Sequence, residues 1–398
     1  MTAAAAVRAG HDGCKDMMAH VAAMWIILLA HNLVSATDLY QCSSDVGIGL
    51  VREADRKGLA VDDVTFWTCP DRVPAFWPHT QERVSSLRLF KAWDPQWNES
   101  DRWAAWHSLR DFAERNNARI LVSTQVTCNE TEDLKAWKWT TELLRLLGRD
   151  YVMGLAIGNE LELLFTQAAV SPNCVQNLWD GGHFWQRFTS HVAELDTLGL
   201  EDIPVTTAFG GLALAGNPFF EVPGQALVNS FLLKASRKYG RRFAFMWNIY
   251  PYFDQKMTLD PGTVDQCRLA LGRSTCMSPN CNVPTMATLY RQKMFQLTGM
   301  KDSLMWIGET GWSSPKSPDI RTAVANCKAW SDITALWDFY RSFLYWDLMI
   351  GDERRPDHVF YFTLRDSSTF GVGEHFGLIK TCKDDLCKIQ ADSFVQHI

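Results

Sequence analysis

Short apolar runs alternate with longer helical patterns along most of this chain, and this alternation limits its possible folds more than any other feature. Seven apolar, β-rich runs occupy residues 84–90, 118–126, 151–159, 203–208, 243–250, 304–308 and 358–363, and a weaker run at 45–50 is the candidate for a first strand. Apolar residues spaced three and four apart predict helices over 100–116, 131–147, 180–199 and 331–350. Strands alternating with helices indicate a parallel sheet, and eight strands are what a (β/α)8 barrel requires. We therefore predict an α/β fold, a TIM barrel.

Two irregular segments interrupt the pattern, at 51–82 and 254–284, and both are rich in residues that favour loops. We expect them to be long loops near the mouth of the barrel, trimmed by disulfides. No linker suggests a second domain. With 398 residues and 47% hydrophobic residues, the chain suits one large core. A formal net charge of −6 argues against a nucleic-acid partner, which normally requires a basic face.

The N-terminal segment resembles a targeting signal. Val21–Ala30 is an apolar stretch of signal-peptide length, and Val34–Ala36 supplies small residues for cleavage. We expect a signal peptide over 1–36 and a single mature domain over 37–398. A retained signal anchor, or a start at Met17 or Met18, remains the alternative. The stretch is too short to cross a bilayer comfortably, so no stable membrane span is expected.

Cysteine usage also indicates the secretory route. Cleavage after Ala36 would leave ten of the eleven cysteines, an even number that favours disulfides in an oxidising compartment. The pairing stays open, although Cys276/Cys281 and Cys382/Cys387 are candidates for local bridges. Zinc is the rival interpretation, but the spacing of the pairs does not favour it, and we expect no metal site. Two glycosylation sequons, Asn98–Ser100 and Asn129–Thr131, support a secreted, extracellular or cell-wall protein.

Two of the apolar runs end in a glutamate. Leu155–Ile157 leads through Gly158 and Asn159 to Glu160, and Met305–Ile307 leads through Gly308 to Glu309. A carboxylate at the end of a buried strand is costly to desolvate, and in a barrel both would face the mouth where active sites lie. Two carboxylates at one mouth are what cleavage of a glycosidic bond requires. The alternative is that each is a solvated loop residue.

Six segments resemble glycoside hydrolase family 17, the β-1,3-glucanases and their transglycosylating relatives. The resemblance keeps its order over roughly residues 84–390, and its segments are Leu87–Phe90, Leu155–Glu160, Val205–Ala208, Asn248–Phe253, Ile307–Ser313 and Glu374–Leu378. It implies that Glu160 is the acid/base and Glu309 the nucleophile. The chain departs from the family at Ser313-Ser314, where Pro-Ser is usual, and it has no lysine in Asp366–Thr369.

Six further residues are candidates for substrate binding. Asn159, beside Glu160, can hydrogen-bond a sugar 2-hydroxyl, and Arg88 can orient the nucleophile or form a structural ion pair. Tyr250, Phe253 and Trp312 can line the cleft and stack on sugar rings, and packing near the mouth is the alternative for Phe253. Glu374 is either a cleft carboxylate or a solvated loop residue. These candidates are Arg88, Asn159, Tyr250, Phe253, Trp312 and Glu374.

These observations predict a retaining glycoside hydrolase that acts on β-1,3-glucan. A glucanosyltransferase would use the same two carboxylates, and a non-catalytic glycan-binding protein on the same barrel is the alternative from another class. We expect a polysaccharide or oligosaccharide substrate, no cofactor and a monomer.

Overall fold

The computed structural model describes residues 50–251, 264–314, 327–366, 375–384 and 387–389 of the chain. All of them belong to one compact unit, Gln41–Ile398. The boundary expected at 36/37 lies outside the described residues and stays a prediction.

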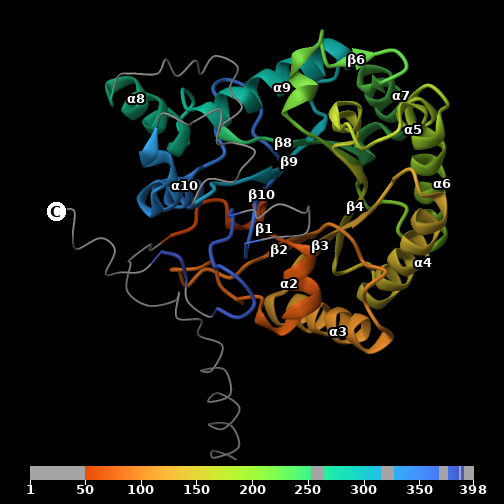
Figure 1. The fold of residues 1–398 in the computed structure, drawn as a ribbon, viewed down its shortest axis with the longest axis horizontal. Coiled ribbons are helices and arrows are strands. Elements are labelled where there is room, and N and C mark those ends of the chain that lie inside the picture. Colours follow the sequence, from red (N-terminus) through yellow and green to blue (C-terminus); the bar gives the residue numbers. More distant parts are fainter. Residues whose placement is uncertain (1–49, 252–263, 315–326, 367–374, 385–386, 390–398) are drawn as a thin grey trace, which may run out of the picture. The chain divides into compact units, whose positions relative to one another are not determined.

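Eight parallel strands close into a barrel, which confirms the predicted (β/α)8 fold (Figure 1). Their order around the barrel is β1-β10-β9-β8-β5-β4-β3-β2. The strands are β1 (Lys57–Val61), β2 (Ser86–Leu89), β3 (Arg119–Thr124), β4 (Val152–Asn159), β5 (Val205–Phe209), β8 (Phe243–Asn248), β9 (Leu304–Thr310) and β10 (His358–Tyr361). A short antiparallel pair, β6 (Glu221–Val222) and β7 (Ala226–Leu227), lies outside the barrel sheet.

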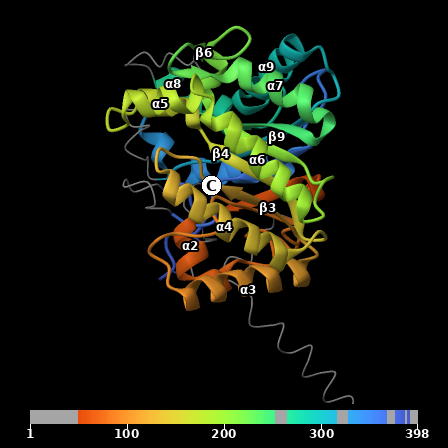
Figure 2. The ribbon, with the colours of Figure 1, turned by 90° about the vertical axis from the view of Figure 1, so that its right-hand side faces the viewer.

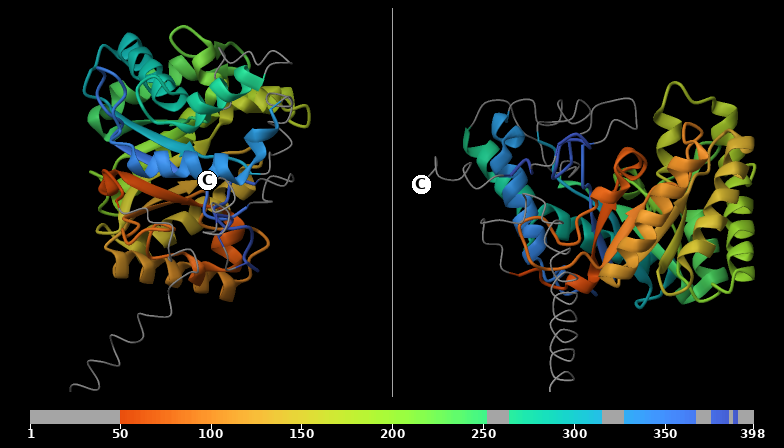
Figure 3. Two further views of the ribbon diagram at one scale, coloured as in Figure 1. Left: turned by 90° about the vertical axis from the view of Figure 1, so that its left-hand side faces the viewer. Right: turned by 90° about the horizontal axis from the view of Figure 1, so that it is seen from below.

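Helices surround the strands in Figure 1. They are α2 (Asp63–Thr68), α3 (Glu99–Asn116), α4 (Glu130–Leu147), α5 (Pro172–Trp179), α6 (His183–Thr197), α7 (Val228–Tyr239), α8 (Val264–Thr275), α9 (Asn282–Thr298) and α10 (Ile333–Tyr345). Figure 2 faces α3, α4 and α6, and the left view of Figure 3 faces α10 on another side. The four predicted helices are present as α3, α4, α6 and α10. The prediction of a loop over 254–284 is wrong where α8 and the start of α9 lie.

Large side chains from β9 and β10 fill the barrel interior opposite glycines. A Cβ on Gly154 would lie 2.9 Å from the ring of Trp306, and one on Gly58 would lie 2.5 Å from the ring of Phe360. Both rings belong to a buried cluster whose other members are Leu121, Met153, Ala156, Ala208, Ala244 and Met246. The barrel is therefore packed with side chains below its mouth, as is usual for this fold.

The first strand is not where the sequence pattern placed it. Residues 45–49 of the predicted run lie outside the described residues, and the barrel strand is β1, inside the segment expected to be a loop. β1 begins with the charged residue Lys57, so the sequence pattern does not identify the short apolar run that follows as a buried strand. The Lys57 side chain is wholly buried, and Nζ donates to the carbonyls of Arg52, Leu344 and Trp346 at 2.7–2.9 Å. Burial lowers the pKa of Lys57 to about 7.

Disulfides tie the loops and the outer helices together. The bonds are Cys69–Cys382, Cys128–Cys174, Cys267–Cys327 and Cys276–Cys281. The local bridge Cys276–Cys281 confirms one candidate pair. The other pair is wrong, because Cys382 bonds to Cys69, and Cys387 is disulfide-bonded as well.

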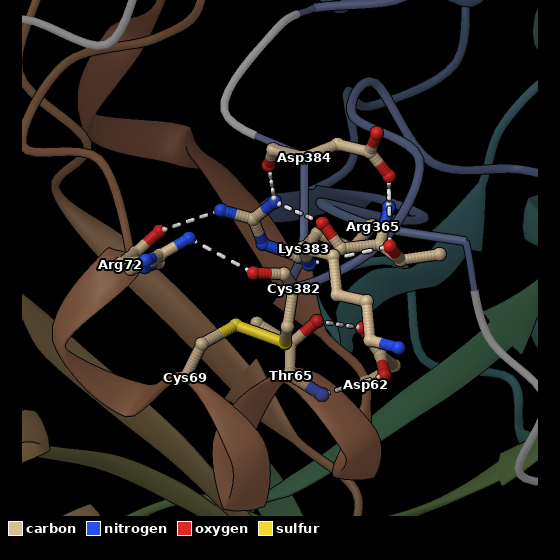
Figure 4. Close-up of a disulfide and its surroundings, with 9 residues drawn as sticks. Asp62, Thr65, Cys69, Arg72, Arg365, Cys382, Lys383 and Asp384 are labelled. Carbon is tan, nitrogen blue, oxygen red and sulfur yellow. Dashed lines mark hydrogen bonds between the residues drawn. A yellow bond between two sulfur atoms is a disulfide. The ribbon is translucent and has the colours of Figure 1, made fainter.

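The Cys69–Cys382 bridge lies in a hydrogen-bonded cluster that joins the loop after β1 to the C-terminal segment (Figure 4). Arg72 donates to the carbonyl of Cys382 at 2.9 Å. Arg365 donates to the carbonyls of Thr381 and Asp384, each at 2.8 Å. These contacts hold segments distant in the sequence together beside the last barrel strand.

No helix in the described ranges is long and apolar enough to cross a membrane.

Candidate active site

Polar side chains at the ends of three strands lie at the mouth of the barrel, where the carboxyl ends of its strands meet. β4 ends at Asn159, directly before Glu160, β8 ends at Asn248, and Glu309 is the penultimate residue of β9. The register between β8 and β9 shifts after Trp247, which places Asn248 opposite Glu309. Irregularities of this kind redirect side chains at barrel rims. As a result, the two glutamates that the sequence singled out lie at one mouth.

The side-chain amide of Asn248 bridges the two glutamates. Its Nδ2 donates to Oε1 of Glu160 and to Oε1 of Glu309, each at 3.0 Å. Oε1 of Glu160 and Oε1 of Glu309 therefore lie at most about 6 Å apart. Carboxyl groups about 5–5.5 Å apart are typical of retaining glycosidases, and a gap of about 6.5–9.5 Å is typical of inverting ones. The bridge is compatible with the retaining value.

Glu309 is held by donors on both carboxylate oxygens. Arg88, on β2, donates from Nη1 to Oε1 of Glu309 at 2.9 Å and from Nη2 to Oδ1 of Asn159 at 2.8 Å. The hydroxyl of Tyr250 donates to Oε2 of Glu309 at 2.6 Å. Arg88 is 1% exposed and Glu309 is 6% exposed, so solvent screens this ion pair little. These charge-assisted bonds suit an ionised carboxylate at Glu309.

Glu160 has a different environment from Glu309. Its backbone adopts a left-handed conformation, with φ 51° and ψ 38°, and the chain then turns into the 3-10 helix η5 (Leu161–Thr166). The side chain is partly accessible at the mouth, yet desolvation raises the pKa of Glu160 to about 7. Repulsion from Glu309 raises it as well, while the bond from Asn248 and the charge of Arg88 oppose the shift. Glu160 can thus hold a proton near neutral pH.

The other predicted binding residues have mixed outcomes. Tyr250 contacts Glu309 as described, and its ring lies 5.2 Å from that of Phe376. Phe253 and Glu374 lie outside the described residues.

Trp312 requires a correction, because its side chain is 0% exposed. The indole packs against Trp330 and Phe339 at ring distances of 5.3 and 5.7 Å, and Nε1 donates to the carbonyl of Trp330. Trp312 therefore packs in the core of this structure, and the prediction that it lines the cleft is wrong.

A pocket of about 450 Å³ opens beside Asn159. Its walls come from the segment after β2, the end of β3 and the start of α4, and they include Trp93, Gln125 and Lys91. Lys91 Nζ lies 3.1 Å from Asp63 and 2.8 Å from Asp94. An aromatic ring next to several polar groups offers both an apolar face and hydrogen-bonding partners to a ligand.

Sequence reasoning missed Asn248 and, apart from Asn159, the residues that line the pocket. Asn248 stood in a quoted motif, but only Tyr250 and Phe253 were selected from it. A polar residue at the end of an otherwise apolar strand was the available signal, the same signal that identified Glu160 and Glu309. Lys91 and Asp94 lie in the segment after β2, whereas Asp63 begins α2, and nothing in the spacing of the chain indicates that Asp63 meets the other two.

Within the part of the chain that the structure describes, no group of three or more His, Cys, Asp or Glu residues is arranged to hold a metal ion.

No family model matches the chain, and no curated protein does. Solved structures resemble it only distantly. A β-glucosidase from Exiguobacterium marinum has 10% identity and a TM-score of 0.43, covering 83% of this chain and 93% of its own. GH5_18 from Streptomyces cattleya, in complex with Manβ1-4GlcNAc, has 13% identity and a TM-score of 0.45, covering 82% and 76%. A family 39 glycoside hydrolase from Bacteroides cellulosilyticus has 14% identity and a TM-score of 0.41, covering 82% and 60%. Similarities this distant say nothing about activity.

The buried pair Arg88–Glu309 leads to a stability prediction. Arg88→Met should lower the free energy of unfolding by about 3–5 kcal/mol, because it leaves a buried carboxylate without its cation. The double variant Arg88→Met/Glu309→Gln should recover part of that loss. Urea unfolding of the wild type, both single variants and the double variant at pH 7 gives the coupling energy. Additive losses would show that the two side chains do not interact.

Proposed function

We propose that this protein is a retaining glycoside hydrolase. The observation that carries the proposal is the Asn248 amide, which joins Glu160 and Glu309 across the mouth. The two carboxyl groups also differ in environment, since an arginine and a tyrosine hold Glu309 while burial raises the pKa of Glu160 to about 7. Neighbouring carboxyl groups with separated protonation states are what an acid and a nucleophile need.

The chemistry follows from these positions. In the first step Glu309 attacks the anomeric carbon while Glu160 protonates the departing glycosidic oxygen, which yields a covalent glycosyl-enzyme. In the second step Glu160, now ionised, takes a proton from water, which attacks the same carbon and releases Glu309. Arg88 holds the side chain of Asn159, and we propose that Asn159 binds the sugar 2-hydroxyl through a bond that strengthens in the transition state.

For the substrate we propose β-1,3-linked glucan. The support is the resemblance of the strand-end motifs, above all Asn248–Phe253, to glycoside hydrolase family 17. The pocket beside Asn159, the residue that precedes Glu160, provides room for sugar units.

Proton NMR of laminarin digestion tests the proposal. The first products should be β-anomers, because two displacements restore the original configuration. Products longer than the substrate would identify a glucanosyltransferase, in which a second sugar replaces water. Initial α-anomers would contradict a retaining mechanism, and binding without any cleavage would favour the glycan-binding alternative.

The pKa of Glu160 leads to a prediction for pH dependence. The acid must be protonated in the free enzyme, so kcat/KM should fall as pH rises through about 7, the value for Glu160. The wild type should show this alkaline limb on an aryl glycoside whose leaving group still needs protonation, and the limb should disappear in Glu160→Ala on the same substrate. A pH series of kcat/KM for both proteins measures it. An unchanged alkaline limb in the variant would assign that ionisation to another group.

We also propose that the protein passes through the secretory route. Its support is the signal-like segment and the sequons in the sequence, together with four disulfides among the described residues.

A further inference from the structure

A second buried carboxyl group lies behind Glu160. Glu162, two residues further on in η5, is 0% exposed, and its Oε1 accepts a hydrogen bond from the backbone nitrogen of Gly210 at 2.6 Å. Its Oε2 is also buried and has no hydrogen-bonding partner among the described residues. The Glu162 side chain therefore lies against the loop after β5 that borders Glu160.

Gly210, which follows β5, is in contact with both carboxyl groups. A Cβ placed on it would lie 2.7 Å from Oε1 of Glu160 and 3.4 Å from Oε1 of Glu162. Its φ of −84° is open to any residue, so glycine is needed here for space and not for backbone conformation. From α9, the hydroxyl of Tyr290 donates to the Gly210 carbonyl at 3.1 Å. The Gly210 residue is thus fixed through both its N–H and its carbonyl while it packs against Glu160.

The surroundings favour the neutral form of Glu162. The groups that face it are Glu160, from its own segment, the Gly210 backbone from the β5 loop, and the neutral Tyr290 hydroxyl from α9. Burial raises the pKa of Glu162 to about 8, and repulsion from Glu160 adds to the rise. An unpartnered buried oxygen makes ionisation costlier still.

We propose that Glu162 is a positioning residue that, as a neutral carboxylic acid, holds the Gly210 backbone against Glu160 and so aims the proton of Glu160 at the leaving group. The inference rests on the proposed function. While it keeps its own proton, Glu162 adds no second negative charge beside Glu160 after Glu160 has given its proton to the leaving group. A glutamine keeps both the shape and the acceptor oxygen, so it should replace Glu162, whereas an apolar residue should not.

The first test measures stability and needs no substrate. The pKa of Glu162 in the folded state, about 8, lies above the ordinary value of 4.5, so the wild type loses stability relative to Glu162→Gln as pH rises through that interval. Thermal melts from about pH 5 to pH 8 should therefore show the Tm difference, variant minus wild type, growing with pH. A constant difference over this range would mean that Glu162 ionises at or below its ordinary pKa, as a solvated or an ion-paired carboxylate does, because its titration would then end near the lower limit of the range. That result overturns the proposal.

The second test uses the leaving group. Glu162→Leu and Gly210→Ala should lower kcat/KM on laminarin about tenfold to a hundredfold, because the first leaves the Gly210 N–H unpaired and the second pushes Glu160 aside. The loss on a 2,4-dinitrophenyl β-glycoside should be much smaller, since that leaving group needs little protonation. Glu162→Gln should stay within about threefold of the wild type on both substrates.

Leu195→Ala, a cavity variant in the buried face of α6, is the control for general destabilisation and should lower both activities equally or not at all. Equal losses on both substrates in Glu162→Leu, or a Glu162→Gln enzyme as impaired as Glu162→Leu, would overturn the positioning role. Failure of the proposed function would show differently, as near-normal activity on laminarin in Glu309→Gln or in Glu160→Ala.

Discussion

Glu309→Gln is expected to lower kcat on laminarin about 10⁴-fold or more, because an amide cannot form the covalent glycosyl-enzyme. The substitution keeps the size of the side chain and one acceptor oxygen for Arg88 and Asn248, so the barrel should stay folded. Initial rates on laminarin, together with circular dichroism of the same preparation, measure both effects.

Glu194→Gln is the matched control for this variant. Glu194 lies on α6, away from the mouth, where it accepts a hydrogen bond from the indole of Trp137. The Glu194→Gln substitution should leave kcat on laminarin unchanged. Near-normal turnover by a folded Glu309→Gln protein would refute the assignment of the nucleophile.

Glu160→Ala should lose most of its activity on substrates with poor leaving groups and less on substrates with good ones. On laminarin, the poor sugar leaving group needs the proton of Glu160, and kcat/KM should fall about 10²–10⁴-fold, the usual contribution of a general acid. On a 2,4-dinitrophenyl β-glycoside the first step should proceed, and the glycosyl-enzyme should accumulate because water is no longer deprotonated. Added azide should then restore turnover and yield the β-glycosyl azide, since azide needs no general base.

The measurement is steady-state kinetics on both substrates with and without azide, with product identification by NMR. Equal losses on both substrates and no azide effect would mean that Glu160 binds the sugar but does not transfer the proton. The measurement with azide also distinguishes the role of Glu160 from that of Glu309, because Glu309→Gln forms no glycosyl-enzyme for azide to attack.

The sequence was sufficient for those parts of the fold that rest on a simple repeating pattern. The run 151–159 is apolar up to Asn159 at its end, and the run 304–308 is apolar throughout. A strand buried on both faces requires such a run, so β4 and β9 could be located directly. β1 could not, because it begins with a lysine. Its charge is accommodated by three carbonyl groups, two of them from a segment almost 290 residues away. No local pattern reveals a partner at that distance.

The residues of the candidate site also fall into two groups, those that a local sequence pattern reveals and those that it does not. Glu160 and Glu309 stood out because a carboxylate ends an apolar run. Whether an aromatic residue just past a strand faces the mouth or the core depends on which distant segments pack against it, and Trp312 packs against Trp330. The functional importance of Glu162 depends on Gly210, which belongs to another loop. Contacts between loops follow from the folded structure and not from spacing in the chain.

The bond between Cys69 and Cys382 has a consequence for how the protein is made. It spans 313 residues, and it lies beside the seam where β1 pairs with β10. Because a chain is synthesised from its N-terminus, Cys69 has no partner until Cys382 has been made, after the strands of the barrel. Cys128 and Cys174 are only 46 residues apart and can form their bond early. A chain that stops before residue 382 would leave the Cys69 thiol exposed to wrong partners during biosynthesis.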